Sequence, residues 1–156
     1  MMYFEDIPLD ETREMGSYTF TEEEIIKFAS EWDPQPFHTD PVAAEESIFG
    51  GLVASGWHLC AIWMHLMVTN RKREREAGVE RVAAGVSPGF RDLKWLAPVR
   101  PDDTITYHST TTEKVDLRSR PEFGILRSLN EGINQDGVRV LSFTGQVFMP
   151  RKPKGE

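Results

Sequence analysis

The sequence has little of several things that mark whole classes of protein. It contains one cysteine, Cys60, among 156 residues, so no disulfide can form within the chain and no metal site can be built from several thiolates. It also lacks an excess of positive charge, because 18 Lys and Arg residues stand against 25 Asp and Glu residues, a net charge of −7. Nucleic acids and anionic membranes repel such a chain, so we expect neither as a partner.

Long apolar runs are also missing. The longest apolar segment covers residues 52–68 and is interrupted by Ser55, Gly56, His58 and His65, whereas a membrane-spanning helix needs about 20 cleaner residues. The first residues of the chain are acidic where a secretory signal needs a basic start. Together with the single cysteine, these absences predict a cytoplasmic protein whose long apolar segment is a buried helix.

Length and pattern favour one domain over residues 1–156, since domains usually contain about 100–150 residues. Helical spacing dominates up to about Ala77, and strand patterns follow. Residues 55–76 form the longest helical segment, apolar on nearly all sides up to Val68, and we expect the rest of the chain to enclose it. A long enclosed helix followed by antiparallel strands predicts the α+β class, with a curved sheet wrapped around the helix.

Shorter helices are expected before the long one. Residues 21–32 fit a helix that ends before Pro34, because proline disfavours helical geometry in the preceding residue. Pro34 and Pro36 then predict an extended segment. Asp40 is a typical N-cap residue followed by proline, which predicts a short helix to about Ser47.

The second half of the chain has strand patterns. Residues 104–107 alternate between polar and apolar types, and a run of threonines follows them. The pair Asp136-Gly137 is typical of a β-hairpin turn. On a final strand, one face carries Leu141, Phe143, Val147 and Met149, with Ser142, Thr144 and Gln146 opposite.

The strongest candidate for chemistry is the pair Asp33 and His38. A carboxylate and an imidazole can take up and release protons near neutral pH, as the addition or removal of water requires. An extended segment would hold the two side chains apart, so a bend is needed for both to grip one water. Asp, Pro and His are also ordinary loop residues, so the spacing alone is more typical of a helix end followed by a structural turn.

The glycine-containing segment 49–56 is the second candidate. Its sequence is F-G-G-L-V-A-S-G, and it leads into the long helix. Glycines let a backbone approach a ligand, and the free amides of a helix N-terminus favour developing negative charge, such as that of a thioester oxygen. Tight packing of the helix is the structural alternative.

Two further features carry weaker signals. His58 and His65 share one helical face near Cys60, but a metal would need at least one more ligand, so we expect core or pocket residues and no metal site. The basic run 71–75 could meet coenzyme phosphates, but it is more typical of a solvated helix end.

Taken together, these segments resemble the MaoC-like dehydratases, a family that includes the (R)-specific enoyl-CoA hydratases. The matching segments are D-P-Q-P-F-H at 33–38, F-G-G-L-V-A-S-G at 49–56, and L-A-P-V-R-P-D-D-T at 96–104. The resemblance extends over nearly the whole chain in the order of its elements. It implies a hot-dog fold, in which a curved antiparallel sheet wraps around a long central helix, and a homodimer or a higher even oligomer.

The resemblance also implies roles for individual residues. Asp33 and His38 match the catalytic pair that activates water, and Gly56 matches the glycine whose amide holds the thioester oxygen. Gln35 stands where the family has asparagine, and Ser55 where it usually has histidine. With Trp57, these residues are expected to contact the substrate.

We therefore expect an acyl-CoA hydratase or dehydratase, which adds or removes water across the 2,3 double bond of an enoyl thioester. Coenzyme A is then part of the substrate, and no separate cofactor is implied. A hot-dog thioesterase is one alternative, although the long helix has no acidic residue before Glu74. A catalytically silent acyl-binding or scaffold subunit is another, because Gln35 and Ser55 depart from the family pattern.

Overall fold

The computed structural model describes residues 2–80 and 85–153. Its elements, in chain order, are a 3₁₀ turn η1 (Phe4–Asp6), β1 (Thr12–Thr19), α1 (Glu22–Trp32), α2 (Pro36–Thr39), α3 (Pro41–Glu45), α4 (Gly56–Glu76), β2 (Gly89–Trp95), β3 (Thr104–Asp116), β4 (Phe123–Ile133) and β5 (Arg139–Pro150).

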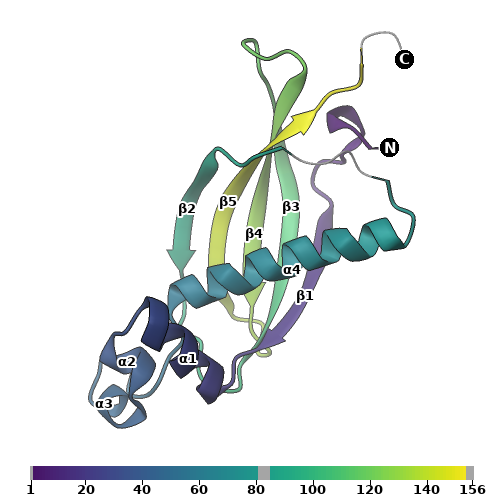
Figure 1. Ribbon diagram of the computed structural model, residues 1–156. Helices are drawn as coiled ribbons and strands as arrows, with labels where there is room; N and C mark the ends of the chain where they lie inside the picture. The colour runs from purple at the N-terminus through teal and green to yellow at the C-terminus, as the bar shows by residue number, and fades with distance from the viewer. Residues whose placement is uncertain (1, 81–84, 154–156) are drawn as a thin grey trace.

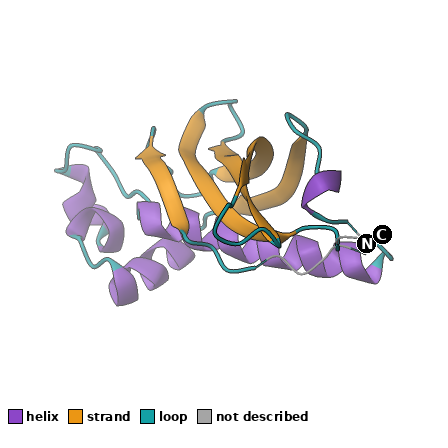
Figure 2. Cartoon of the chain, turned by 90° about the horizontal axis from the view of Figure 1, so that it is seen from above, coloured by secondary structure: helices purple, strands orange, loops and turns teal. Residues whose placement is uncertain are grey.

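The strands form one antiparallel sheet in the order β1-β3-β4-β5-β2, so β1 and β2 are its edges. The sheet curves around α4, which crosses its concave face, and α1, α2 and α3 gather at one end of this helix (Figure 1 and Figure 2). This arrangement is the hot-dog fold, and it confirms the predicted α+β class. Strand β1 was not predicted, and the division into a helical first half and a strand-rich second half is wrong at that point.

The long helix α4 is enclosed on one side only. His58 and Leu59 are buried, and Tyr107 of β3 donates a hydrogen bond from its hydroxyl to the Leu59 carbonyl at 3.0 Å. Trp57, Met64 and Val68 on the same helix are 51%, 49% and 55% exposed. The second half of the chain therefore encloses α4 on one face only, because a single sheet covers one face of a helix.

Local sequence signals explain the helix boundaries. The Thr21 hydroxyl accepts a hydrogen bond from the Glu24 amide at the start of α1, and α1 ends at Trp32, as predicted. The Asp40 carboxylate caps α3 by accepting from the amides of its first turn. That helix ends at Glu45, slightly before the expected boundary.

The predicted extended segment after Pro34 is partly wrong. Gln35 is extended, but Pro36 begins the helical turn α2. Proline fits the first position of a helix because its missing N–H would have no intrahelical acceptor there. This turn supplies the bend that brings His38 back toward Asp33.

The strand predictions are confirmed. The segment 104–107 lies in β3, and Gly137 has a φ of 76° in the turn between β4 and β5, a backbone conformation that favours glycine. Leu141 and Phe143 of β5 are buried in the main core, and Met149 is buried in a second, smaller core.

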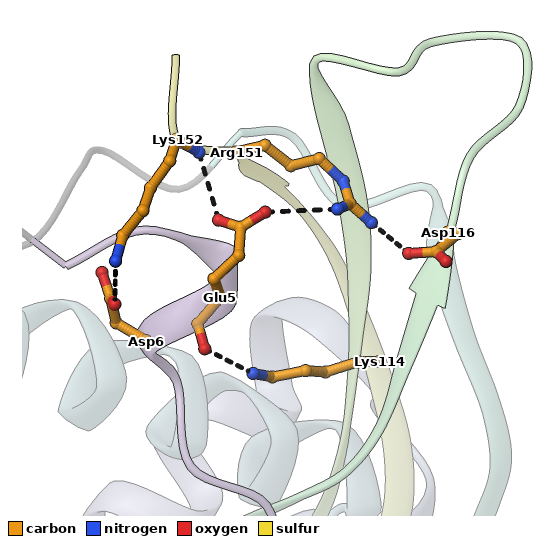
Figure 3. Close-up of polar contacts among 6 residues, drawn as sticks. All are labelled: Glu5, Asp6, Lys114, Asp116, Arg151 and Lys152. Atoms are coloured by element: carbon orange, nitrogen blue, oxygen red, sulfur yellow. Dashed lines mark hydrogen bonds and ion pairs between the residues drawn. The ribbon is translucent and has the colours of Figure 1, made fainter. Parts of the chain in front are cut away.

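A second, smaller core lies at the end of the sheet far from α1–α3. Phe4 of η1 is buried against Gly124 of β4, where an added Cβ would lie 2.3 Å from the Phe4 ring. The cations of Lys114 and Arg151 lie over this ring. Polar contacts tie η1 to β3 and to the segment after β5 (Figure 3). Glu5 accepts from the Arg151 guanidinium at 3.2 Å, and its backbone carbonyl accepts from Lys114 at 3.0 Å.

No helix in the described part of the chain is both long and apolar enough to cross a membrane. Residues 2–80 and 85–153 also hold no group of three or more His, Cys, Asp or Glu side chains placed to bind a metal ion.

Candidate active site

Asp33 and His38 are brought together by the junction of α1 and α2. Asp33 follows the last residue of α1, and its N–H donates to the Ala29 carbonyl at 2.9 Å. His38 lies in the single turn of α2. The His38 Nε2 atom is 3.3 Å from Oδ2 of Asp33. The two side chains therefore act on the same small volume, as a water-activating pair must.

A backbone carbonyl fixes the orientation of the His38 ring. Its side chain is buried, and Nδ1 lies 2.7 Å from the Val53 carbonyl oxygen. Because a carbonyl oxygen can only accept, Nδ1 carries the hydrogen in this arrangement. In the neutral ring Nε2 is then the basic nitrogen, and it is the atom that faces Asp33.

The Asp33 carboxylate accepts hydrogen bonds on both oxygens. The Ser55 hydroxyl donates to Oδ2 at 2.7 Å, and the Gln35 side-chain amide donates to Oδ1 at 2.8 Å. Burial alone would raise the pKa of Asp33, but these two hydrogen bonds and the nearby His38 lower it below its usual value. The carboxylate is therefore held in its ionised form.

A cavity of about 560 Å³ opens next to this pair. Asp33 and His38 are the ionisable residues among those described that line it. The remaining lining is almost entirely apolar and comes from the ends of α1 and β2, the start of α4 and the loops between them: Trp32, Gln35, Phe37, Phe49, Val53, Ala54, Gly56, Trp57, Leu59, Trp95, Leu96, Ala97, Pro98 and Val99. An apolar chamber with one acid–base pair suits a small organic substrate.

The structure separates the expected substrate contacts into two groups. Gln35, Gly56 and Trp57 line the cavity. Ser55 is fully buried and is not among the lining residues, because its hydroxyl bonds to Asp33 and accepts from the Trp57 amide as the N-cap of α4. Ser55 is thus placed to support the carboxylate, and its assignment as a substrate contact stays a prediction.

Three residues that contribute to the site were not singled out from the sequence. Val53 fixes the imidazole through its carbonyl, and Trp32 and Trp95 form parts of the cavity wall. The sequence positions of both tryptophans could have indicated a place near the site, since Trp32 directly precedes Asp33 and Trp95 directly precedes the segment 96–104. No side-chain pattern points to a backbone carbonyl such as that of Val53.

His58 lies apart from the pair, in the core. Its ring stacks on Phe28 at a centroid distance of 4.4 Å and an interplanar angle of 5°, and it contacts Phe20 edge-on at 4.9 Å. The Nδ1 atom of His58 is buried without a hydrogen-bond partner in the described part of the chain. Burial lowers the pKa of His58 to about 4, although the nearby Glu24 opposes the shift. His65, by contrast, is exposed.

Comparison with protein families identifies the domain. The model of the MaoC-like domain matches residues 5–130, which include the pair, the glycine segment and the loop before β3. The crystal structure of a MaoC-like dehydratase from Rhodospirillum rubrum is 33% identical, covers 98% of this chain and 99% of its own, and superposes with a TM-score of 0.83.

Relatives with curated sequences agree with this match. An uncharacterized protein of Bacillus subtilis, YdeM, is 29% identical over 96% of this chain and 100% of its own length. The protein MaoC of Klebsiella aerogenes is 35% identical over 76% of this chain, but the match spans only 33% of that longer protein. With a family model that covers most of its length, a hot-dog fold and a matching dehydratase structure, the chain belongs to the MaoC-like dehydratase family.

Proposed function

We propose that the protein adds water to, or removes it from, the 2,3 double bond of an enoyl thioester of coenzyme A. Membership of the MaoC-like dehydratase family supports the hydratase/dehydratase class. The observation that carries the proposal is the approach of His38 Nε2 to Asp33 Oδ2 at 3.3 Å beside an apolar cavity. A paired base and carboxylate next to an apolar chamber suit water addition to an acyl chain.

In the hydration direction, a water in the cavity hydrogen-bonds to both the Asp33 carboxylate and Nε2 of His38. The pair takes one proton from this water as its oxygen bonds to the β-carbon of the substrate. The electrons of the double bond move toward the thioester carbonyl and form an enolate. The pair then returns a proton to the α-carbon, so that the sum is the addition of one water. Dehydration is the reverse.

Gly56 is the group proposed to stabilise the enolate. It is the first residue of α4, so its N–H has no acceptor within the helix, and it lines the cavity next to the pair. A helix N-terminus favours negative charge, which is greatest on the thioester oxygen in the enolate. Coenzyme A enters as part of the substrate. The proton transfers and the stabilisation of the enolate are carried out by the chain's own groups.

A panel of 2-enoyl-CoA thioesters tests the proposal. Hydration removes the conjugated double bond, so the absorbance of the enoyl thioester should fall with time while no free thiol appears. Release of free coenzyme A thiol would instead indicate the thioesterase alternative. Binding without any turnover across the panel would indicate a silent acyl-binding subunit.

Replacement of Ser55 by alanine should lower kcat/KM for hydration by about tenfold, the effect of losing one hydrogen bond to a charged group. Because that bond lowers the Asp33 pKa, the acidic limb of the kcat/KM–pH profile should also move to higher pH. A pH titration of wild type and variant measures both effects. Loss of the α4 N-cap alone would lower stability without moving this limb, so an unmoved limb would contradict the support role.

We expect the working form to be a homodimer or an even multiple of it. The edge strand β2 carries half-exposed Phe90 and Trp95, and the exposed side of α4 presents Trp57, Met64 and Val68. Open strand edges and apolar patches of this kind favour self-association. Light scattering should give about twice the 17.8 kDa chain mass or an even multiple of it. A monomer that still hydrates enoyl-CoA would contradict the expectation.

A further inference from the structure

The indole of Trp95 lies directly on the first turn of α4. A Cβ atom added to Gly56 would be 2.2–2.5 Å from three atoms of this ring system, so the contact requires glycine there. The Cys60 thiol, one helical turn after Gly56, also interacts with the Trp95 side chain, which opposes the rise of the thiol pKa caused by burial. Trp95 ends the edge strand β2. The indole thus packs against the first turn of α4.

Trp57 meets this indole almost at a right angle. The ring centroids are 5.2 Å apart with an interplanar angle of 80°, which is a favourable edge-to-face contact. Both tryptophans line the cavity that contains Asp33 and His38. Together they form an aromatic wall, defined as Trp57 and Trp95, at the start of α4.

The cavity stops at this wall. Among the described residues, no α4 residue after Leu59 lines it, and neither does any residue of β3, β4 or β5. A long acyl chain lying between the helix and the sheet would contact those elements. This cavity therefore lies at the end of the hot-dog fold and does not extend along α4.

The chamber also offers nothing to pair with a charged acyl end. Its described lining contains no lysine or arginine, and Asp33 and His38 are its ionisable groups. A buried carboxylate without a partner is costly, so an acyl group with a terminal carboxylate is disfavoured.

From this geometry we infer that the aromatic wall sets the acyl length, and that the substrates are thioesters of short, uncharged enoyl groups. The inference rests on the proposed function and makes it more specific. The thioester oxygen lies at the Gly56 amide, and the β-carbon lies at the pair, so carbons beyond the β-carbon reach the wall directly. Trp95 is then a specificity-determining residue. Its removal joins the cavity to the region around Cys60, where a longer chain gains space.

The test compares 2-enoyl-CoA thioesters with chains of four, six, eight and ten carbons. Wild type should have its highest kcat/KM at four carbons and lose at least about tenfold by eight carbons, since a pocket discriminates by about tenfold or more per poorly fitting group. Trp95→Ala should raise the ratio of eight-carbon to four-carbon kcat/KM by at least about tenfold. If the alanine variant fails to fold, Trp95→Leu takes its place. Leucine keeps more apolar packing, and this variant should shift the ratio in the same direction.

Phe90→Ala is the matched control. Phe90 lies on the same strand and is 55% exposed, but it does not line the cavity. The dependence of kcat/KM on chain length in Phe90→Ala should therefore remain that of wild type. A four-carbon enoyl-CoA with a terminal carboxylate should be a poor substrate for the wild-type protein.

Two results overturn the inference: a wild-type protein that handles eight carbons as well as four, or folded Trp95 variants that keep the wild-type profile. Calorimetric binding of butyryl-CoA and octanoyl-CoA decides the same question without turnover, and the inference requires tighter binding of butyryl-CoA by wild type and a smaller preference in Trp95→Ala. If no enoyl-CoA of any length is hydrated, the proposed function fails, and this binding order still tests the wall.

Discussion

Replacement of Asp33 by asparagine is expected to lower enoyl-CoA hydration by about 10²–10⁴-fold, the usual effect of removing a positioned acid or base. Asparagine keeps the shape of the side chain but removes the negative charge that faces His38 Nε2 at 3.3 Å. Its amide group also cannot accept from both Ser55 and Gln35 as the carboxylate does. The measurement is kcat on an enoyl-CoA that the wild-type protein accepts, with circular dichroism to verify the fold.

Asp40→Asn provides the control for this substitution. Asp40 caps α3 close to the site but does not line the cavity, and asparagine is an equally good N-cap. This variant should retain wild-type turnover. His38→Ala should show a loss of the same order as Asp33→Asn. A folded Asp33→Asn protein with wild-type kcat would show that the site is wrongly assigned.

Replacement of His58 by phenylalanine is expected to remove a large part of the acid sensitivity of folding. Burial lowers the pKa of His58 from 6.5 to about 4 in the folded protein, so the unfolded chain binds a proton more readily between these pH values. The resulting stability is fully present above pH 6.5 and is lost as the pH falls toward 4. The shift corresponds to at most about 3 kcal/mol in the free energy of unfolding.

Phenylalanine suits this position because it preserves the ring contacts with Phe28 and Phe20 and removes the unpartnered Nδ1. Urea unfolding of wild type and variant at several pH values, at one protein concentration, measures the effect. The variant should gain stability relative to wild type as the pH falls from 6.5 to 4. His65→Phe, on the exposed side of α4, should follow the wild-type pH dependence. Parallel curves for wild type and His58→Phe would contradict the burial of a neutral imidazole.

Elements with local signals were predictable from the sequence, and those that depend on distant partners were not. Asp40 and the proline after it fixed the start of α3 within a few residues. Strand β1 has no such signal, since Met15 is its buried residue and polar side chains surround it. It is held by β3, through hydroxyl pairs such as Thr12 with Thr110 at 2.8 Å. Pairing between residues so far apart in the sequence cannot be predicted from a local pattern.

The same distinction holds at the candidate site. Asp33 and His38 lie close in sequence, so their spacing could suggest a pair. The hydrogen bond from Ser55 to Asp33 joins residues 22 positions apart, and no spacing pattern indicates it. Which side of α4 would stay exposed could not be predicted, because an apolar helix gives no sign of which side the sheet will leave open.

The contacts around Glu5 and Arg151 have a practical consequence for experiments with the immobilised protein. They hold the first and last described segments next to each other, at the end of the molecule opposite α1, α2 and α3 (Figure 1). A surface linker attached next to either of these segments would therefore lie at the end of the molecule opposite the helices that carry Asp33 and His38. A linker attached at both ends would pull η1 and the segment after β5 apart, and these side-chain contacts would be the first to carry the load.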